Sequence, residues 1–261
     1  MFGASGNRLT GKERMAEFRT RQVFRLGAAL LAIGALSGCQ SIDVNSSNSA
    51  QLRVFNASPD SQGFDYYTGK TAIVYNVGFG AFNLGYVSLP PGTQTITTDQ
   101  TGTTQVLAAV NASLASQKNY TVITSNVAAN LQETIFADQN TAAPAGQIAV
   151  RVINEATRIG AVDIYLVPNG GKLSTTTPVA VGIAFNMNSG YIDVPASVSY
   201  SIAVVATGTT PASSTTLYNG TQACFTTGCV DTFMVIDTPL TTAPAANAVV
   251  LNDFTPPTTT G

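Results

Sequence analysis

The sequence contains no histidine and no tryptophan, and charged residues make up only 10% of its 261 positions. Soluble domains average about 25% charged residues. The absence of histidine excludes a Ser-His-Asp triad and removes the commonest zinc ligand. The chain also has no Gly-x-Ser-x-Gly turn and no glycine-rich phosphate loop. Most enzyme classes are therefore not expected here, and we predict no cofactor.

Basic residues are scarce beyond the first 38 positions. Half of the 12 Lys and Arg precede residue 39, which leaves 6 basic against 12 acidic side chains and a formal charge of −6 in the remainder. Binding to nucleic acid or to an anionic membrane surface requires clustered Lys and Arg. Neither is an expected partner of the chain after residue 38.

The N-terminal segment has the layout of a secretory signal. A basic stretch from Arg19 to Arg25 precedes about a dozen mostly apolar residues, fewer than the roughly 20 that a membrane-spanning helix needs. The run ends in Leu36-Ser37-Gly38-Cys39, which resembles the bacterial lipobox, in which the cysteine is acylated and becomes the first mature residue. We expect residues 1–38 to be a cleaved signal peptide and Cys39 to carry a lipid.

Three further points concern this segment. By the same resemblance, Gln40 in place of Asp favours the outer membrane, on its periplasmic or surface-exposed side. An ordinary signal followed by a chance cysteine, or a buried core helix, are the alternatives. Translation could start at Met15 instead of Met1, because the stretch before Arg19 is long for a signal.

Internal similarity divides the rest of the chain. Leu52-Arg53-Val54-Phe55-Asn56 recurs as Val150-Arg151-Val152-Ile153-Asn154, and Gly85 to Pro90 recurs as Gly190 to Pro195. Such ordered blocks indicate a tandem duplication. We predict a flexible tether at 39–50, a first repeat at 51–140, a Pro/Gly-containing linker, a second repeat at 147–254 and a disordered tail at 255–261.

Short β-branched and aromatic runs dominate both repeats, separated by turn residues every 8 to 12 positions. Tyr120–Thr124, Tyr200–Ala206 and Thr232–Ile236 are predicted strands, and Asn169-Gly170 and Asn219-Gly220 are predicted turns. Only Val106–Ala115 could pass for a helix, and Asn111 interrupts it. The expected fold is all-β, with two tandem Ig-like antiparallel β-sandwiches.

The repeats also resemble a family of bacterial envelope proteins that carry domain of unknown function 4397. Its members often open with an Arg-Val-x-x-Ala-Ser-Pro-Asp stretch, followed by an Asp-x-Tyr strand. Residues 53–60 and 65–67 fit this pattern, whereas the second repeat keeps Arg151, Asp163 and Tyr165 but loses the Ser-Pro-Asp part. The resemblance implies an Ig-like fold and supplies no activity.

Two cysteines remain after Cys39. Cys224 and Cys229 are an even pair, and such a pair in an exported protein normally forms a disulfide. A redox-active dithiol would be expected as Cys-x-x-Cys, and a zinc site would need further ligands that the chain does not offer. We predict a structural bridge between Cys224 and Cys229, and no metal site.

Acidic and aromatic residues are the remaining candidates for a site. Asp65 and Asp163 precede strand tyrosines and are expected to make local structural contacts, and Asp60 is expected to cap backbone amides in a turn. Tyr66, Tyr67 and Tyr86 belong to an aromatic cluster that forms either a binding surface or a sandwich core.

These observations favour a non-catalytic, lipid-anchored cell-envelope protein that serves as a surface binding, adhesion or structural module. Its partner would be a polysaccharide or another envelope protein. The alternative is a carboxylate-dependent glycan-processing enzyme, which needs two acidic side chains across a groove.

Overall fold

The computed structural model describes residues 48–196, 199–212, 216–221 and 226–257. These residues belong to one compact unit. The predicted signal peptide, the predicted lipidation site Cys39 and most of the predicted tether lie outside the described residues, as does the tail from residue 258.

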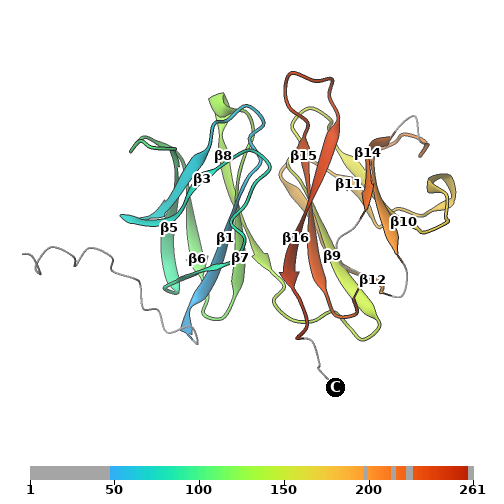
Figure 1. Ribbon diagram of the computed structural model, residues 1–261, viewed down its shortest axis with the longest axis horizontal. Coiled ribbons are helices and arrows are strands. Elements are labelled where there is room, and N and C mark those ends of the chain that lie inside the picture. Colours follow the sequence, from blue (N-terminus) through green and yellow to red (C-terminus); the bar gives the residue numbers. More distant parts are fainter. Residues whose placement is uncertain (1–47, 197–198, 213–215, 222–225, 258–261) are drawn as a thin grey trace, which may run out of the picture. The chain divides into compact units, whose positions relative to one another are not determined.

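The first repeat consists of eight strands in two sheets (Figure 1). Its inner sheet, which faces the second repeat, has the order β4-β1-β7-β8, and its outer sheet has the order β3-β2-β5-β6. The strands are β1 (Ala50–Asn56), β2 (Phe64–Thr68), β3 (Thr71–Val77), β4 (Val87–Leu89), β5 (Gly92–Gln100), β6 (Val106–Leu114), β7 (Asn119–Ser125) and β8 (Gln132–Asp138). A short 3-10 helix, η2 (Ala128–Asn130), connects β7 to β8.

The second repeat has the same strand order. Its inner sheet is β12-β9-β15-β16 and its outer sheet is β11-β10-β13-β14. The strands are β9 (Gln147–Asn154), β10 (Val162–Pro168), β11 (Ala180–Ile183), β12 (Met187–Pro195), β13 (Tyr200–Ala206), β14 (Thr216–Thr221), β15 (Val230–Asp237) and β16 (Ala246–Phe254). A 3-10 helix, η3 (Leu173–Thr175), lies between β10 and β11. The shared topology supports the duplication that the sequence predicts.

The predicted all-β pair of sandwiches is confirmed, with one refinement. Strand β1 pairs with β7 in parallel, and β9 pairs with β15 in parallel, while the other ladders are antiparallel. The first and seventh strands of each repeat are far apart in sequence, so a long connection can bring them together with the same direction. The sheets are therefore antiparallel, as expected, except for one parallel ladder in each repeat.

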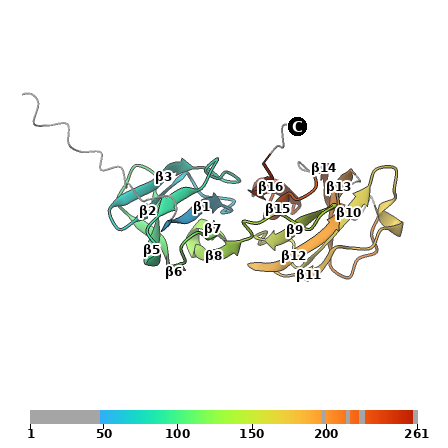
Figure 2. The same ribbon diagram turned by 90° about the horizontal axis from the view of Figure 1, so that it is seen from below.

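The central strands of both inner sheets are buried on both faces. Alternate side chains of a strand point to opposite faces. On β1, Leu52 and Val54 join the core of the first repeat, while Phe55 joins a separate apolar cluster that contains residues of both repeats. Strand β15 is buried along its whole length for the same reason. The inner sheets thus pack against each other as well as against their own outer sheets (Figure 2).

Three local predictions have clear outcomes. Tyr120–Thr124, Tyr200–Ala206 and Thr232–Ile236 lie in strands, as expected, and the segment with helical character forms β6. Asn169-Gly170 is a turn, but Asn219-Gly220 lies inside β14, paired with β13. A Cβ at residue 220 would lie only 2.2 Å from the Tyr218 hydroxyl, so Gly220 makes room for a side chain instead of a turn. No helix among the described residues is long and apolar enough to cross a membrane.

Candidate functional site

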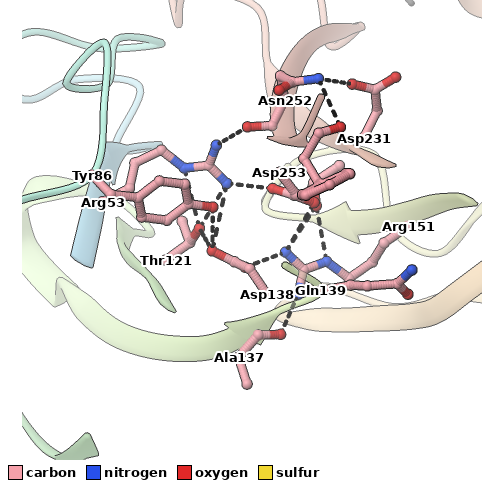
Figure 3. Close-up of polar contacts among 12 residues, drawn as sticks. Arg53, Tyr86, Thr121, Ala137, Asp138, Gln139, Arg151, Asp231, Asn252 and Asp253 are labelled. Atoms are coloured by element: carbon pink, nitrogen blue, oxygen red, sulfur yellow. Dashed lines mark hydrogen bonds and ion pairs between the residues drawn. The ribbon is translucent and has the colours of Figure 1, made fainter. Parts of the chain in front are cut away.

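The most extensive polar constellation lies between the two inner sheets (Figure 3). We call it the arginine network, and it consists of four pairs of residues at equivalent places in the two repeats. The first strand supplies an arginine, the seventh strand a threonine, the last strand an aspartate, and the segment at the fourth strand a tyrosine. Its members are Arg53 and Arg151, Thr121 and Thr232, Asp138 and Asp253, and Tyr86 and Tyr191.

Arg53 bridges from the first repeat to the second. Its Nη2 donates to Asp253 Oδ1 at 2.6 Å, and its Nη1 donates to the carbonyl of Asn252 at 2.9 Å. Nη2 also donates to Thr121 Oγ1 at 2.9 Å within its own repeat. The guanidinium lies over the ring of Tyr86, 4.8 Å from its centroid.

Arg151 makes the same contacts in the opposite direction. Its Nη2 donates to Asp138 Oδ1 at 2.6 Å, and its Nη1 donates to the carbonyl of Ala137 at 2.9 Å. Nη2 donates to Thr232 Oγ1 at 2.8 Å, and the guanidinium lies 4.7 Å from the ring centroid of Tyr191.

The remaining carboxylate oxygens are also satisfied in matching fashion. Asp138 Oδ2 accepts from Thr121 Oγ1 at 2.6 Å and from the Tyr86 hydroxyl at 2.9 Å. Asp253 Oδ2 accepts from Thr232 Oγ1 at 2.5 Å and from the Tyr191 hydroxyl at 2.8 Å. Every carboxylate oxygen of the network therefore has a hydrogen-bond donor.

Burial makes these charges dependent on one another. The arginine side chains are 3% exposed and the aspartate side chains are fully buried. Burial lowers the pKa of Arg53, but Tyr86, Asp253 and Asp138 raise it by more, so its net pKa is raised and it stays charged. Burial and the neighbouring Asp138 raise the pKa of Asp253, while the two arginines oppose that shift.

The chemistry of the network is structural. A catalytic carboxylate must reach a substrate, yet both aspartates are covered and each is paired with an arginine from the other repeat. A cleft of about 480 Å³ does open beside the network, and its walls include Arg53, Tyr86, the exposed Leu84 and Asp253, although the Asp253 side chain is fully buried. The arrangement holds the repeats together and offers no free acid.

The sequence contained a signal for this network that composition alone did not reveal. An arginine stands inside an otherwise apolar strand at the same position of both repeats, and a charge in such a place requires a partner. The two aspartates that supply the partners were not among the predicted site residues. Asp253 lies 200 residues from Arg53, and Asp138, although only 13 residues before Arg151, belongs to the other repeat.

The three tyrosines predicted as a binding surface do not lie together. Tyr66 is fully buried, and its hydroxyl donates to Thr124 Oγ1 at 3.0 Å, so its assignment to a surface was wrong. It points into the sandwich because it alternates with Tyr67 along β2. Tyr86 covers Arg53 in the network and lines the cleft beside it, whereas Tyr67 borders a separate open depression.

That depression, which we call the tyrosine platform, lies on the outer sheet of the first repeat. It measures about 730 Å³, and its walls are Asp65, Tyr67, Tyr75 and the turn Thr101–Thr104. The rings of Tyr67 and Tyr75 meet edge to face, with centroids 5.9 Å apart, and Tyr75 is 63% exposed. Partial burial, Tyr75 and Asp65 raise the pKa of Tyr67.

Asp65 holds the platform's shape. Its Oδ1 accepts from the backbone N–H of Asn76 at 2.8 Å and from Thr101 Oγ1 at 3.0 Å, and its Oδ2 accepts from the N–H of Gly102 at 3.0 Å. Burial alone would raise the pKa of Asp65, but these hydrogen bonds lower it below its ordinary value. Asp163 binds the N–H of Gly182 at 2.8 Å in the equivalent place. Both contacts are structural, as expected.

The equivalent place in the second repeat is covered. Strand register aligns Tyr67 with Tyr165 and Tyr75 with Val181. Tyr165 is only 5% exposed, because Leu173 of η3 packs against its cluster. In the first repeat the corresponding connection is only Gly69 and Lys70, too short to cover Tyr67.

The other predicted residues are placed as follows. Asp60 lies in a turn, and its carboxylate accepts from the backbone N–H of Ala128 at 2.8 Å, a residue of η2 instead of a near neighbour. Cys229 is buried in the core of the second repeat. Cys39 and Cys224 lie outside the described residues, so the bridge stays a prediction. The described part of the chain has no group of three His, Cys, Asp or Glu that could hold a metal ion.

The fold and the network define a class, a pair of β-sandwiches joined through a buried network of reciprocal ion pairs. Residues 50–165 match the family model of the domain of unknown function DUF4397, so this part of the chain belongs to the family that its motifs indicated. The match covers the first repeat and reaches Tyr165 of the second. No curated protein matches the chain.

Solved structures show only distant similarity. A family CBM26 module from Eubacterium rectale Amy13K, in complex with maltoheptaose, shares 10% identity over 80% of this chain and 98% of its own, with a TM-score of 0.26. The Bacillus anthracis TIE protein shares 10% identity over 74% of this chain and 34% of its own, with a TM-score of 0.23. A streptococcal virulence factor that binds alpha-glucan shares 10% identity over 71% and 92%, with a TM-score of 0.23. TM-scores this low carry no argument about the ligand.

Proposed function

We propose that this protein is a non-catalytic, lipid-anchored envelope protein that binds polysaccharide at the tyrosine platform. The observation that carries the proposal is the contrast between the repeats: Tyr67 and Tyr75 are open in the first, while Tyr165 is covered and Val181 replaces the second ring. Aromatic faces beside threonine hydroxyls suit sugar rings, which have apolar faces and hydroxyl groups at their edges. The platform carries no cation among its walls.

Binding is favoured over glycan cleavage by the placement of the acids. A carboxylate-dependent hydrolase needs two accessible carboxyl groups on opposite sides of a groove. Asp138 and Asp253 are buried and paired, and Glu155 is also fully buried. Asp65 is 3% exposed and already accepts three hydrogen bonds.

The binding test uses the chain without its first 39 residues on a glycan array, followed by titration with the retained polysaccharide. We expect Tyr75→Ala to weaken binding at least about fivefold, because a stacking aromatic ring contributes about 1 kcal/mol or more. Val181→Ala is the matched control, since Val181 has the equivalent position and is 61% exposed. If the chain retained an envelope protein and no glycan, polysaccharide would be the wrong ligand. Release of cleaved sugar would favour the alternative function, a carboxylate-dependent glycan-processing enzyme.

The lipid anchor is a separate part of the proposal. It rests on the Leu-Ser-Gly-Cys sequence at residues 36–39. Metabolic labelling with a palmitate analogue should mark the wild-type protein, and Cys39→Ser should remove the label and either release the protein from the membrane fraction or leave an uncleaved precursor. An unlabelled wild-type protein would refute the anchor without affecting the sugar-binding test.

A further inference from the structure

The contact between the repeats has the symmetry of a homodimer. The contacts that the two arginines make across the repeats occur twice with the roles of the repeats exchanged, at 2.6 and 2.6 Å for the ion pairs and at 2.9 and 2.9 Å for the carbonyl contacts. The tyrosine hydroxyls follow the same rule, at 2.9 and 2.8 Å. An interface in which residue i meets j while j meets i is isologous.

The apolar part of the interface follows the same pattern. One cluster joins both repeats, and six of its members occupy equivalent strand positions in three pairs. The first repeat contributes Phe55 on β1, Ile123 on β7 and Phe136 on β8. The second contributes Ile153 on β9, Met234 on β15 and Leu251 on β16.

We infer that the inner sheet of either repeat is a self-complementary docking surface whose partner is a second repeat of the same kind, and that the linker between the repeats is not needed to hold the pair together. Each repeat contributes one guanidinium and one carboxylate, so any two such surfaces balance their charges. A first repeat that met another copy would find Asp138 where it now finds Asp253, and the carbonyl of Ala137 where it now finds that of Asn252.

The side chains of the interface also indicate which pairs of repeats should bind more tightly. The large rings of the cluster belong to the first repeat, and the second contributes aliphatic side chains, among which Met234 is the most adaptable. A mixed pair fits rings against these smaller side chains, whereas two first repeats bring rings against rings. We therefore expect the mixed pair to be the tighter one. In every pairing the tyrosine platform stays free, since it lies on the outer sheet.

The test cuts the linker of the otherwise intact chain. A protease recognition sequence is inserted between Thr141 and Ala142, which are both exposed, and the folded protein is cleaved. We expect the two fragments to elute as one particle in size-exclusion chromatography at about 10 μM, within the range of specific protein contacts. Separation of the wild-type fragments would overturn the inference.

The matched variant carries Asp138→Asn and Asp253→Asn, which keep side-chain volume and remove both negative charges from the network. Uncut, it should keep the wild-type β-type circular dichroism spectrum, because its linker still joins the repeats; cut, its fragments should separate. If the double variant fails to fold, the single variant Asp253→Asn, which leaves one ion pair between the repeats, takes its place in the same test. Cut variants that stay together as firmly as wild type would contradict the role of the network.

The final arm tests self-complementarity. Cut protein with an affinity tag on its first repeat is mixed with untagged cut protein, and the tagged fragment is captured. Untagged first repeat in the captured material demonstrates pairing between like repeats. Capture of second repeats alone would show a one-way interface and overturn the self-complementary part of the inference.

Discussion

At the residue scale, Arg53 and Arg151 are the side chains whose burial is hardest to achieve. A buried charge is tolerated only when it is paired and its hydrogen-bonding groups are satisfied. Each guanidinium has a carboxylate and a carbonyl from the other repeat, together with a threonine and a tyrosine ring from its own. Removing one member therefore leaves the others buried without their partners.

We predict that Asp253→Ala lowers the free energy of unfolding by about 3–5 kcal/mol, the usual loss when one partner of a buried ion pair is removed. Asp138→Ala should have an effect of the same size, because it removes the equivalent contact of Arg151. Urea denaturation measures both. The exposed Asp193 on β12 provides the control, and Asp193→Ala should change stability by less than about 0.5 kcal/mol. Equal effects of all three changes would contradict the network's role.

The burial of Glu155 leads us to expect that the stability of the protein depends on pH. Glu155 is fully buried, and burial raises its pKa from 4.5 to about 8, while Ser125 opposes the shift. Between those two values the folded protein keeps a proton that the unfolded chain has released. The free energy of unfolding should therefore fall as pH rises from about 4.5 to about 8, by up to about 1.4 kcal/mol per pH unit.

The variant Glu155→Gln tests this dependence, because its amide cannot ionise. Urea denaturation at pH 5 and pH 8 should show a smaller difference for the variant than for the wild type. Glu133, whose pKa burial raises to about 7, contributes a second part of the wild-type slope, so Glu133→Gln is measured in parallel. An unchanged slope in both variants would show that neither carboxyl is buried in its protonated form.

At the element scale, the two sandwiches differ most where β2, β5, β7 and β8 meet. Tyr66, Thr98 and Thr124 are joined there by hydrogen bonds, and Thr98 also donates to Glu133. Strand register shows apolar side chains at the equivalent positions of the second repeat, namely Ile164, Val204, Val235 and Ala248. The same topology thus accommodates either a polar or an apolar cluster.

We predict that Thr124→Val alone costs about 1–3 kcal/mol, because it removes the nearer acceptor of the buried Tyr66 hydroxyl and leaves it only the Phe55 carbonyl at 3.4 Å. Replacing the whole cluster, as Tyr66→Phe, Thr98→Val, Thr124→Val and Glu133→Ala, should cost less than the single change, since no polar group is then left unpaired. Thermal melts of the two variants decide the matter. A combined variant that is less stable than Thr124→Val would assign the cluster a role beyond hydrogen-bond pairing.

At the scale of the whole molecule, the inner sheets share an apolar cluster and two ion pairs across the repeats. Elements that share a core unfold together when their contact contributes much of the stability of each. The sequence blocks and the linker predict two separate sandwiches, and a fragment ending near Asn140 is still expected to form β structure. Such a fragment would, however, expose Phe55, Ile123 and Phe136.

We predict that the wild-type chain unfolds in a single calorimetric transition, with equal calorimetric and van't Hoff enthalpies. The double variant Asp138→Asn and Asp253→Asn should divide this transition into two, because the network no longer couples the repeats. Two separate transitions in the wild type would mean that the shared interface contributes little to either repeat.

Much of the architecture can be derived from the sequence alone. Short β-branched runs with regular turns predict the all-β class, since period-two patterns suit a sandwich buried on one face. The recurrence around Arg53 and Arg151 predicts two similar units. Residues 36–39 predict an export signal, because such a signal depends on a short local sequence and not on the fold. The absence of histidine likewise excludes a Ser-His-Asp triad without any knowledge of the structure.

Tertiary structure decided what depends on distant segments. The partner of Arg53 lies 200 residues away, so no local pattern identifies Asp253. Tyr66 and Tyr67 are neighbours, yet one is buried and the other borders the platform, because the strand alternates and the fold chooses the inward face. Tyr165 is covered because η3 of the long connection after β10 packs against its cluster, and Tyr67 is open because the connection after β2 is too short to cover it. Exposure and pairing depend on the packing of the whole chain, whereas strand formation and export depend on short stretches.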